Sequence, residues 1–224
     1  MNGNVGSARS NDFEIGLSKG IFSLNFYKNI KIFITTKLWD GIYPFNSRIY
    51  SLKQVHGNRI IEVKKENLRE EEGDGLFTFD REIVLEVKTA DCFPVFIFNK
   101  NLIMLLHVGW RGAKKCIVEK GIEIFKEREN IKDAKVFLGP GIKKCCYEIK
   151  EDVSKFFEDF VEKRNKKIYL DLEKFIIDKF LNRGFQEKNI LYFPYCTSCR
   201  NDLFYSYRKG DKERIRSWIL NKKY

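Results

Sequence analysis

The chain has 224 residues, of which 43% are apolar, and this length favours one domain of above-average size with a substantial core. A formal net charge of +11 could indicate a nucleic-acid partner, but the 42 basic and 31 acidic residues are spread through every segment. No basic repeat, RNP-type aromatic motif or zinc-finger spacing accompanies them. We therefore expect a solvated charged surface and no nucleic-acid partner.

Six cysteines are too few for a disulfide scaffold of this length, and no secretory leader is recognisable before them. No apolar run approaches the roughly 20 residues that span a bilayer. We expect a cytoplasmic protein with reduced thiols and no membrane partner, in which cysteine is free for metal binding or catalysis. The polar residues 1–12 are expected to be disordered, and residues 13–224 to form a single domain.

The first clear elements are three strands. Runs of β-branched and aromatic residues predict strands at 83–88, 94–98 and 102–108, separated by the breaks TADCFP and NKN. From Gly112 the apolar spacing becomes helical and continues to about Arg128. This predicts a helix that directly follows the third strand and buries Cys116 as a core residue.

The second half of the chain continues the alternation of strands and helices. The pattern predicts a short strand in AKVFLGPGI at 134–142, closed by its Gly-Pro-Gly turn, and another strand at 189–196. It predicts helices at 153–161, at 172–180 with Gly184 as the stop, and at 212–223. No internal repeat or proline-rich linker divides these elements. The fold class is therefore predicted to be mixed α/β (α+β) in one domain.

The only two histidines both precede backbone-permissive turns. His56 is followed by Gly57, and His107 ends the third strand two residues before Gly109. Cys92 lies in the break between two apolar strands. Two imidazoles and a thiolate make a three-ligand zinc set, which leaves a fourth position open for water or substrate, as in catalytic sites. We therefore predict about one zinc per chain at His56, Cys92 and His107.

Five motifs carry a resemblance to a known family. They are QVHG at 54–57, TADCFPV at 89–95, HVGWRG at 107–112, GPGIKKCCYEI at 139–149 and CTSCRNDLFYSYR at 196–208. In this order they resemble the family once called multicopper polyphenol oxidase or laccase-domain proteins. Members are also described as YfiH-like proteins, purine nucleoside phosphorylases and peptidoglycan editing factors.

The resemblance implies a layered α/β sandwich of mixed β-sheets flanked by helices, with zinc held by His56, Cys92 and His107. It also implies phosphorolysis of adenosine, inosine and methylthioadenosine, with adenosine deamination as a second activity. The expected partners are purine nucleosides and phosphate, and the expected oligomeric state is a monomer or homodimer.

Three residues beside the predicted ligands are candidates for the reaction. Asp91 is expected to act in catalysis by hydrogen bonding to an imidazole or to substrate. Gln54 either faces the substrate or is bonded to backbone as an ordinary strand residue. Arg111 follows the strand at a helix start, where a guanidinium and backbone N–H groups could hold phosphate.

Oxidation by a multicopper centre is rejected by counting ligands. Such an enzyme needs a trinuclear cluster rich in histidine besides a blue-copper site, and two histidines cannot supply both. Copper at the three predicted ligands would be adventitious. A cytidine-type deaminase is the next alternative, because PYCTSC resembles the P-C-x-x-C half of its motif, but the histidine or cysteine two residues before a glutamate is missing.

Two further interpretations stay open. Cys92 paired with a histidine could be the nucleophile of a thiol hydrolase or deamidase. The segment KGDKERIR at 209–216 differs from the Thr-Gly-Arg usual in the family, so the pocket could also bind nucleosides without turnover. A structural zinc site at Cys145, Cys146, Cys196 and Cys199 is not expected, because adjacent cysteines are poor partners for one ion.

Overall fold

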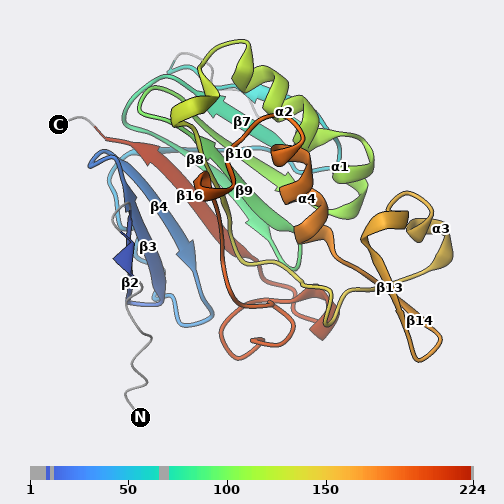
Figure 1. Ribbon diagram of the computed structural model, residues 1–224. Helices are drawn as coiled ribbons and strands as arrows, with labels where there is room; N and C mark the ends of the chain where they lie inside the picture. Colours follow the sequence, from blue (N-terminus) through green and yellow to red (C-terminus); the bar gives the residue numbers. More distant parts are fainter. Residues whose placement is uncertain (1–8, 11–12, 66–70, 223–224) are drawn as a thin grey trace.

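A computed structural model of the chain describes residues 9–10, 13–65 and 71–222. Two mixed β-sheets lie face to face at its centre, and helices cover one outer side (Figure 1). The fold class is mixed α/β, as the order of elements and the family resemblance predicted. Among the described residues, no helix has the length and apolar character needed to cross a membrane.

Within the described residues, the larger sheet has seven strands in the spatial order β1-β2-β3-β4-β16-β8-β5. Its strands are β1 (Arg9–Ser10), β2 (Phe13–Ser18), β3 (Ile21–Phe26), β4 (Ile30–Thr35), β5 (Arg48–Ser51), β8 (Ile83–Thr89) and β16 (Ile215–Asn221). All neighbours are antiparallel except β5 and β8.

In the same part of the chain that the structure describes, the second sheet has six strands in the order β15-β11-β9-β10-β7-β6, and a third sheet has three in the order β12-β14-β13. The strands of the second sheet are β6 (Ile60–Glu62), β7 (Gly75–Thr78), β9 (Phe93–Phe98), β10 (Ile103–Val108), β11 (Lys135–Leu138) and β15 (Ile190–Tyr192). Those of the third are β12 (Glu148–Ile149), β13 (Val161–Arg164) and β14 (Lys167–Leu170). In Figure 1, β13 and β14 stand apart from the two larger sheets.

Helices are few and short. The α-helices are α1 (Trp110–Lys114), α2 (Ile117–Lys126), α3 (Glu151–Ser154) and α4 (Leu172–Leu181), and the 3₁₀ turns are η1 (Ile131–Asp133), η2 (Glu158–Phe160), η3 (Glu187–Asn189) and η4 (Tyr207–Lys209). In Figure 1, α1, α2 and α4 lie on the side of β9 and β10 that faces away from the larger sheet.

The core forms in layers because strand side chains alternate between two faces. Leu85 and Ile219 of the larger sheet meet Phe96 and Leu105 of the second sheet in one fully buried layer. On the other face of β10, Met104 and Leu106 pack in a second layer with the apolar faces of α2 and α4. Both faces of the second sheet are thus covered, which explains why β9 and β10 are apolar at nearly every position.

The register of the central strands places the predicted ligands together. In the antiparallel pair β9 and β10, Val108 lies opposite Phe93, and His107 lies opposite Pro94. The end of β10 therefore lies beside the start of β9, immediately after Cys92. On the other edge of β10, the N–H of His107 donates to the carbonyl of Asp74 at 2.7 Å, just before β7 begins.

The predicted helix at 212–223 is wrong, because β16 (Ile215–Asn221) fills the gap between β4 and β8 in the larger sheet. Trp218 is fully buried there, and its indole N–H donates to Glu86 at 2.7 Å. A short apolar run fits a buried strand or a helix equally well. The open edges of β4 and β8 decided between the two, since residues 217–220 pair with both strands.

Two helical predictions also need correction. The stretch 153–161 is not one helix: α3 ends at Ser154, η2 follows, and Val161 begins β13. The stretch from Gly112 is broken into α1 and α2 at Cys116, whose φ of 63° is left-handed and whose side chain is exposed, not in the core. By contrast, α4 forms as predicted, and Gly184 follows it with a φ of 89°.

The predicted disorder at the beginning of the chain covers residues 1–12. Residues 1–8 and 11–12 lie outside the described residues, so the predicted disorder there stays a prediction. The two intervening residues, Arg9–Ser10, form β1 and pair with β2.

Candidate functional site

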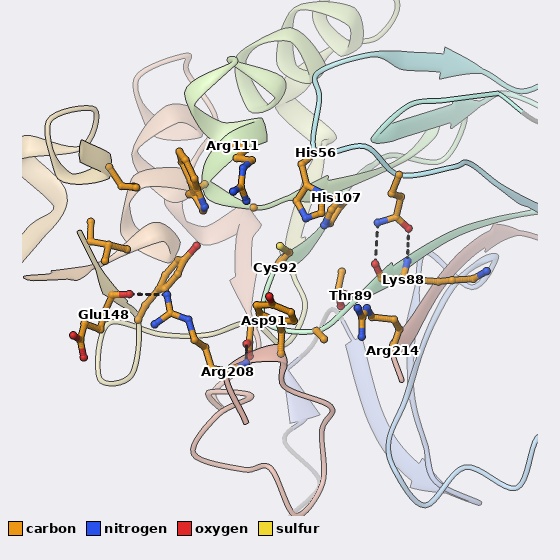
Figure 2. A pocket seen from close by; sticks show the side chains of 18 of the residues that line it. His56, Lys88, Thr89, Asp91, Cys92, His107, Arg111, Glu148, Arg208 and Arg214 are labelled. Atoms are coloured by element: carbon orange, nitrogen blue, oxygen red, sulfur yellow. Dashed lines mark hydrogen bonds between the residues drawn. The ribbon is translucent and has the colours of Figure 1, made fainter. Parts of the chain in front are cut away.

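His56, Cys92 and His107 converge at the carboxyl-terminal end of β10. One ligand atom from each lies within 4.8 Å of the others. The two imidazole rings meet edge to face, with centroids 4.7 Å apart. Figure 2 shows the three side chains directed toward a common point. Residues that are far apart in the sequence thus form one group that could hold a metal ion.

A buried carboxylate organises this group. Asp74 is 1% exposed, and its Oδ1 lies 2.8 Å from Nδ1 of His107. Because a carboxylate accepts, Nδ1 donates to it, and Nε2 is the nitrogen of His107 that can bind a metal once it has lost its own proton. The same carboxylate accepts from the backbone N–H groups of Val55, His56 and Gly57 at 3.3, 2.9 and 2.6 Å. Asp74 therefore orients one imidazole and fixes the turn that carries the other.

The turn at His56 is one that most residues avoid. His56 has a left-handed backbone with a φ of 56°, which costs free energy for a side-chain-bearing residue. The three N–H bonds to Asp74 hold it in place.

At Gly109 the constraint is space, since a Cβ there would lie 2.6 Å from Sγ of Cys92. The glycine after β10 is thus required by the close approach of the thiol.

The metal-free group is strongly polarised. Burial acts to raise the pKa of Cys92, but hydrogen bonds and positive charge from His107 and His56 outweigh it and lower the pKa to about 7. Burial acts to lower the pKa of His107, whereas its hydrogen bonds to Asp74 and Cys92 raise it to about 9. Cys92 is therefore readily available as a thiolate, the form in which cysteine binds metals and attacks electrophiles.

Gln54 lines the cavity beside the group, but its amide is bonded to backbone. Its Nε2 donates to the carbonyl of Lys88 at 2.8 Å, and its Oε1 accepts from the N–H of Lys88 at 2.8 Å (Figure 2). Both polar atoms of the amide therefore attach the segment before His56 to β8. Gln54 therefore lines the cavity and is also bonded to backbone, and its contact with substrate stays a prediction.

Asp91 does not contact an imidazole; Asp74 makes that contact instead. The carboxylate of Asp91 accepts from Oγ1 of Thr197 at 2.7 Å and from the backbone N–H of Arg208 at 2.8 Å. Its backbone is left-handed, with a φ of 83°, and its carbonyl accepts from the N–H of Ile142 at 2.8 Å. Asp91 thus joins three loops next to Cys92.

The group opens into a cavity of about 980 Å³. Five cationic side chains line it, against three carboxylates; they are Lys88, Arg111, Lys150, Arg208 and Arg214. Trp110, Tyr147 and Tyr207 add aromatic surface. Figure 2 shows Arg208 on one side of the group and Lys88 with Arg214 on the other. A cavity with excess positive charge and aromatic walls suits an anionic or phosphate-bearing ligand with a flat ring.

Arg111 lies in this cavity, one residue into α1. Its guanidinium carbon is 4.5 Å from the centroid of the Trp110 ring, and it forms no ion pair with a carboxylate of the described chain. On the opposite wall, Arg208 donates to the carbonyl of Glu148 and lies over the Tyr147 ring. Burial raises the pKa of Tyr147 far above its usual range, so its phenol stays protonated.

Asp74 and Arg208 were not predicted from the sequence as residues of this site. Asp74 stands between two glycines directly before an apolar strand, in GDGLFTF, and a carboxylate leading into a buried strand was the available signal. Arg208 belongs to the SYR motif of the family resemblance, yet 152 positions separate it from His56. Only the pairing of the loops through Asp91 brings it to the cavity.

The chain is similar in sequence to a known family and to several purine nucleoside phosphorylases. The family model described as multi-copper polyphenol oxidoreductase laccase matches residues 34–220. A purine nucleoside phosphorylase of Aquifex aeolicus is 32% identical over 173 residues, 77% of this chain and 82% of that protein. One of Clostridium acetobutylicum is 35% identical over 184 residues, 76% of each chain.

Two solved structures have the same overall fold as this chain. YlmD of Geobacillus stearothermophilus superposes with a TM-score of 0.83 at 22% identity, covering 93% of this chain and 98% of that one. The hypothetical protein YfiH of Bacillus licheniformis gives a TM-score of 0.81 at 21% identity, covering 92% and 97%. With the family model matching most of its length, the chain belongs to the multi-copper polyphenol oxidoreductase laccase family, the YfiH-like proteins.

Proposed function

We propose that this chain is a zinc-dependent purine nucleoside phosphorylase acting on adenosine, inosine and methylthioadenosine, with adenosine deamination as a second reaction. The observation that carries the proposal is the position of His56, Cys92 and His107 in a cavity rich in cationic and aromatic side chains. The relatives named purine nucleoside phosphorylase, at 32% and 35% identity, support the reaction class.

The three side chains fit zinc as a donor set. They offer two imidazole nitrogens and one thiolate, and a buried carboxylate stands behind one imidazole, as is usual for metal-bound histidine. Zinc held there would supply a Lewis acid at the wall of the cavity. Copper would bind the same atoms only adventitiously, since the sequence has two histidines and a multicopper oxidase needs many more.

The cavity side chains account for binding and orientation. Cleavage of the N-glycosidic bond builds positive charge on the ribose, and a phosphate oxygen held beside C1′ offsets that charge. Arg111 and Arg208 supply guanidinium groups for the phosphate, and Arg111 has no competing carboxylate partner among the described residues. Trp110 and Tyr147 offer aromatic surface for the purine, and the protonated phenol of Tyr147 can donate a hydrogen bond.

The direct test is incubation of the zinc-loaded protein with adenosine, with and without phosphate, followed by chromatography of the products. Adenine and ribose 1-phosphate formed only with phosphate are the expected products, with inosine and methylthioadenosine cleaved in parallel reactions. Inosine formed from adenosine regardless of phosphate would identify the deamination. If no purine nucleoside gave a product, the proposed enzymatic activity would be wrong, and a nucleoside-binding protein would be the remaining interpretation.

The lowered pKa of Cys92 favours one second candidate, a thiol hydrolase or deamidase that uses Cys92 as nucleophile. Zinc occupancy separates the two, because a thiolate bound to zinc is unavailable for acylation. Iodoacetamide should modify Cys92 slowly in the zinc-loaded protein and rapidly after chelation. Rapid modification of freshly purified, zinc-replete protein would favour the thiol enzyme.

Substitution of Arg111 tests the phosphate site. Arg111→Gln is expected to raise the KM for phosphate by about tenfold or more, because one charge-assisted hydrogen bond contributes roughly 1.5–3 kcal/mol. The KM for the nucleoside should change little. The exposed Arg128 lies outside the cavity lining and serves as the control, with Arg128→Gln leaving both constants unchanged. An unchanged phosphate KM in Arg111→Gln would assign the phosphate to other cations.

A further inference from the structure

A second group of cysteines lies outside the site described above. Cys145 and Cys146 follow β11 in the sequence, and Cys196 and Cys199 follow β15. The sulfur atoms of all four lie within 4.8 Å of one another. Sγ of Cys199 is 3.5 Å from that of Cys145 and 3.3 Å from that of Cys146. None of the four is in a disulfide.

These spacings match a tetrahedral four-sulfur site. A Zn–S bond of about 2.3 Å gives an edge of about 3.8 Å between sulfur atoms in a tetrahedron. The separations of 3.3 and 3.5 Å are slightly shorter than this edge, and the other sulfur pairs lie within 4.8 Å, so small side-chain rotations bring the sulfur atoms into place. Cys196 and Cys199 also have the C-x-x-C spacing common in structural zinc sites.

The local backbone removes the objection to adjacent cysteines. Consecutive side chains point to opposite sides in a strand but differ by only about 100° in a helical turn. Cys145 and Cys146 lie in such a turn, where the N–H groups of Cys146 and Tyr147 both donate to the carbonyl of Lys143 at 2.9 and 3.0 Å. Both thiols can therefore face the same point.

Two polar groups of the chain lie beside the cluster. The backbone N–H of Lys143 donates to Sγ of Cys196 at 3.4 Å, a contact that stabilises negative charge on sulfur. The guanidinium of Arg164 donates to the carbonyls of Lys144 and Cys145 at 2.8 and 3.4 Å, which places a positive charge beside the cluster. Four thiolates around one zinc would carry a net charge of −2, which such neighbours offset.

We propose that Cys145, Cys146, Cys196 and Cys199 bind a second, structural zinc ion. A site with four protein ligands leaves no open position, which distinguishes it from the three-ligand group at His56. The ion would cross-link the loop after β11, which carries Tyr147, to the loop after β15, which carries Thr197 and its bond to Asp91. The proposal is independent of the reaction, since it concerns only how two walls of the cavity are held.

Metal analysis of the full-length, untagged, zinc-replete chain tests the site. The parent is expected to hold about two zinc ions, and Cys199→Ser one, because Cys199 contacts both adjacent thiols. Cys116→Ser, a change of another exposed cysteine outside the cluster, should retain both. The Cys92→Ala variant isolates the second site, and its zinc X-ray absorption should show sulfur ligands alone, at about 2.3 Å.

Three results would overturn the proposal. They are a zinc content unchanged by Cys199→Ser, nitrogen or oxygen ligands around zinc in Cys92→Ala, and a disulfide within the cluster of protein prepared under reducing conditions. If Cys199→Ser fails to fold, the absorption spectrum of Cys92→Ala decides alone. Catalytic activity is not needed for any of these measurements, so failure of the phosphorylase proposal would leave the result standing.

Discussion

Cys92→Ala is expected to lose one zinc ion per chain relative to the parent and to lose phosphorolysis by about a thousandfold or more. The thiolate is the only sulfur in the group with His56 and His107, and two imidazoles alone hold zinc weakly. A Lewis acid stabilises the transition state by several kcal/mol, and losing it would lower the rate by about this factor. His56→Ala and His107→Ala should lose the same ion. Elemental analysis and the adenosine assay check both parts.

Cys116→Ala is the matched control for this substitution. Cys116 is exposed at the left-handed residue between α1 and α2, away from the three ligand atoms. Its variant should keep the zinc content and turnover of the parent. Stoichiometric retention of this zinc in Cys92→Ala would show that the three residues are not the ligands.

Asp74→Asn is expected to weaken zinc binding about 10- to 100-fold, the usual loss when the partner of a metal-bound histidine is changed. The four groups around the carboxylate are all donors: Nδ1 of His107 and three backbone N–H groups of the turn at His56. An amide NH₂ is also a donor, so either orientation of the introduced amide sets donor against donor. Buried donors left unpaired cost about 1–3 kcal/mol, and unfolding free energy should fall accordingly.

Zinc affinity from competition with a chelator and stability from urea unfolding measure these two effects of Asp74→Asn. Asp159→Asn is the control, because Asp159 is an exposed carboxylate in η2 and its change should leave both quantities unaltered. If Asp74→Asn bound zinc within about twofold of the parent, the carboxylate would not orient His107 for a metal.

Much of the site could be predicted from residue chemistry. Histidine occurs twice and both residues precede glycine-containing turns, so the pairing of His56 and His107 with Cys92 followed from rarity and ligand type. The strands β8, β9 and β10 were equally clear, because long apolar runs must be buried on both faces. These features depend on a few neighbouring residues, which is why the sequence alone determined them.

The remaining features depend on partners that are distant in the sequence. The apolar run 215–221 became a strand because β4 and β8 left edges to pair with, and Asp91 bonded to Thr197 and Arg208, not to an imidazole. Asp74 reached His107 through the pairing of β7 with β10. A carboxylate has several possible donors and a short apolar run several possible folds, so only the tertiary structure, by fixing which segments meet, decided among them.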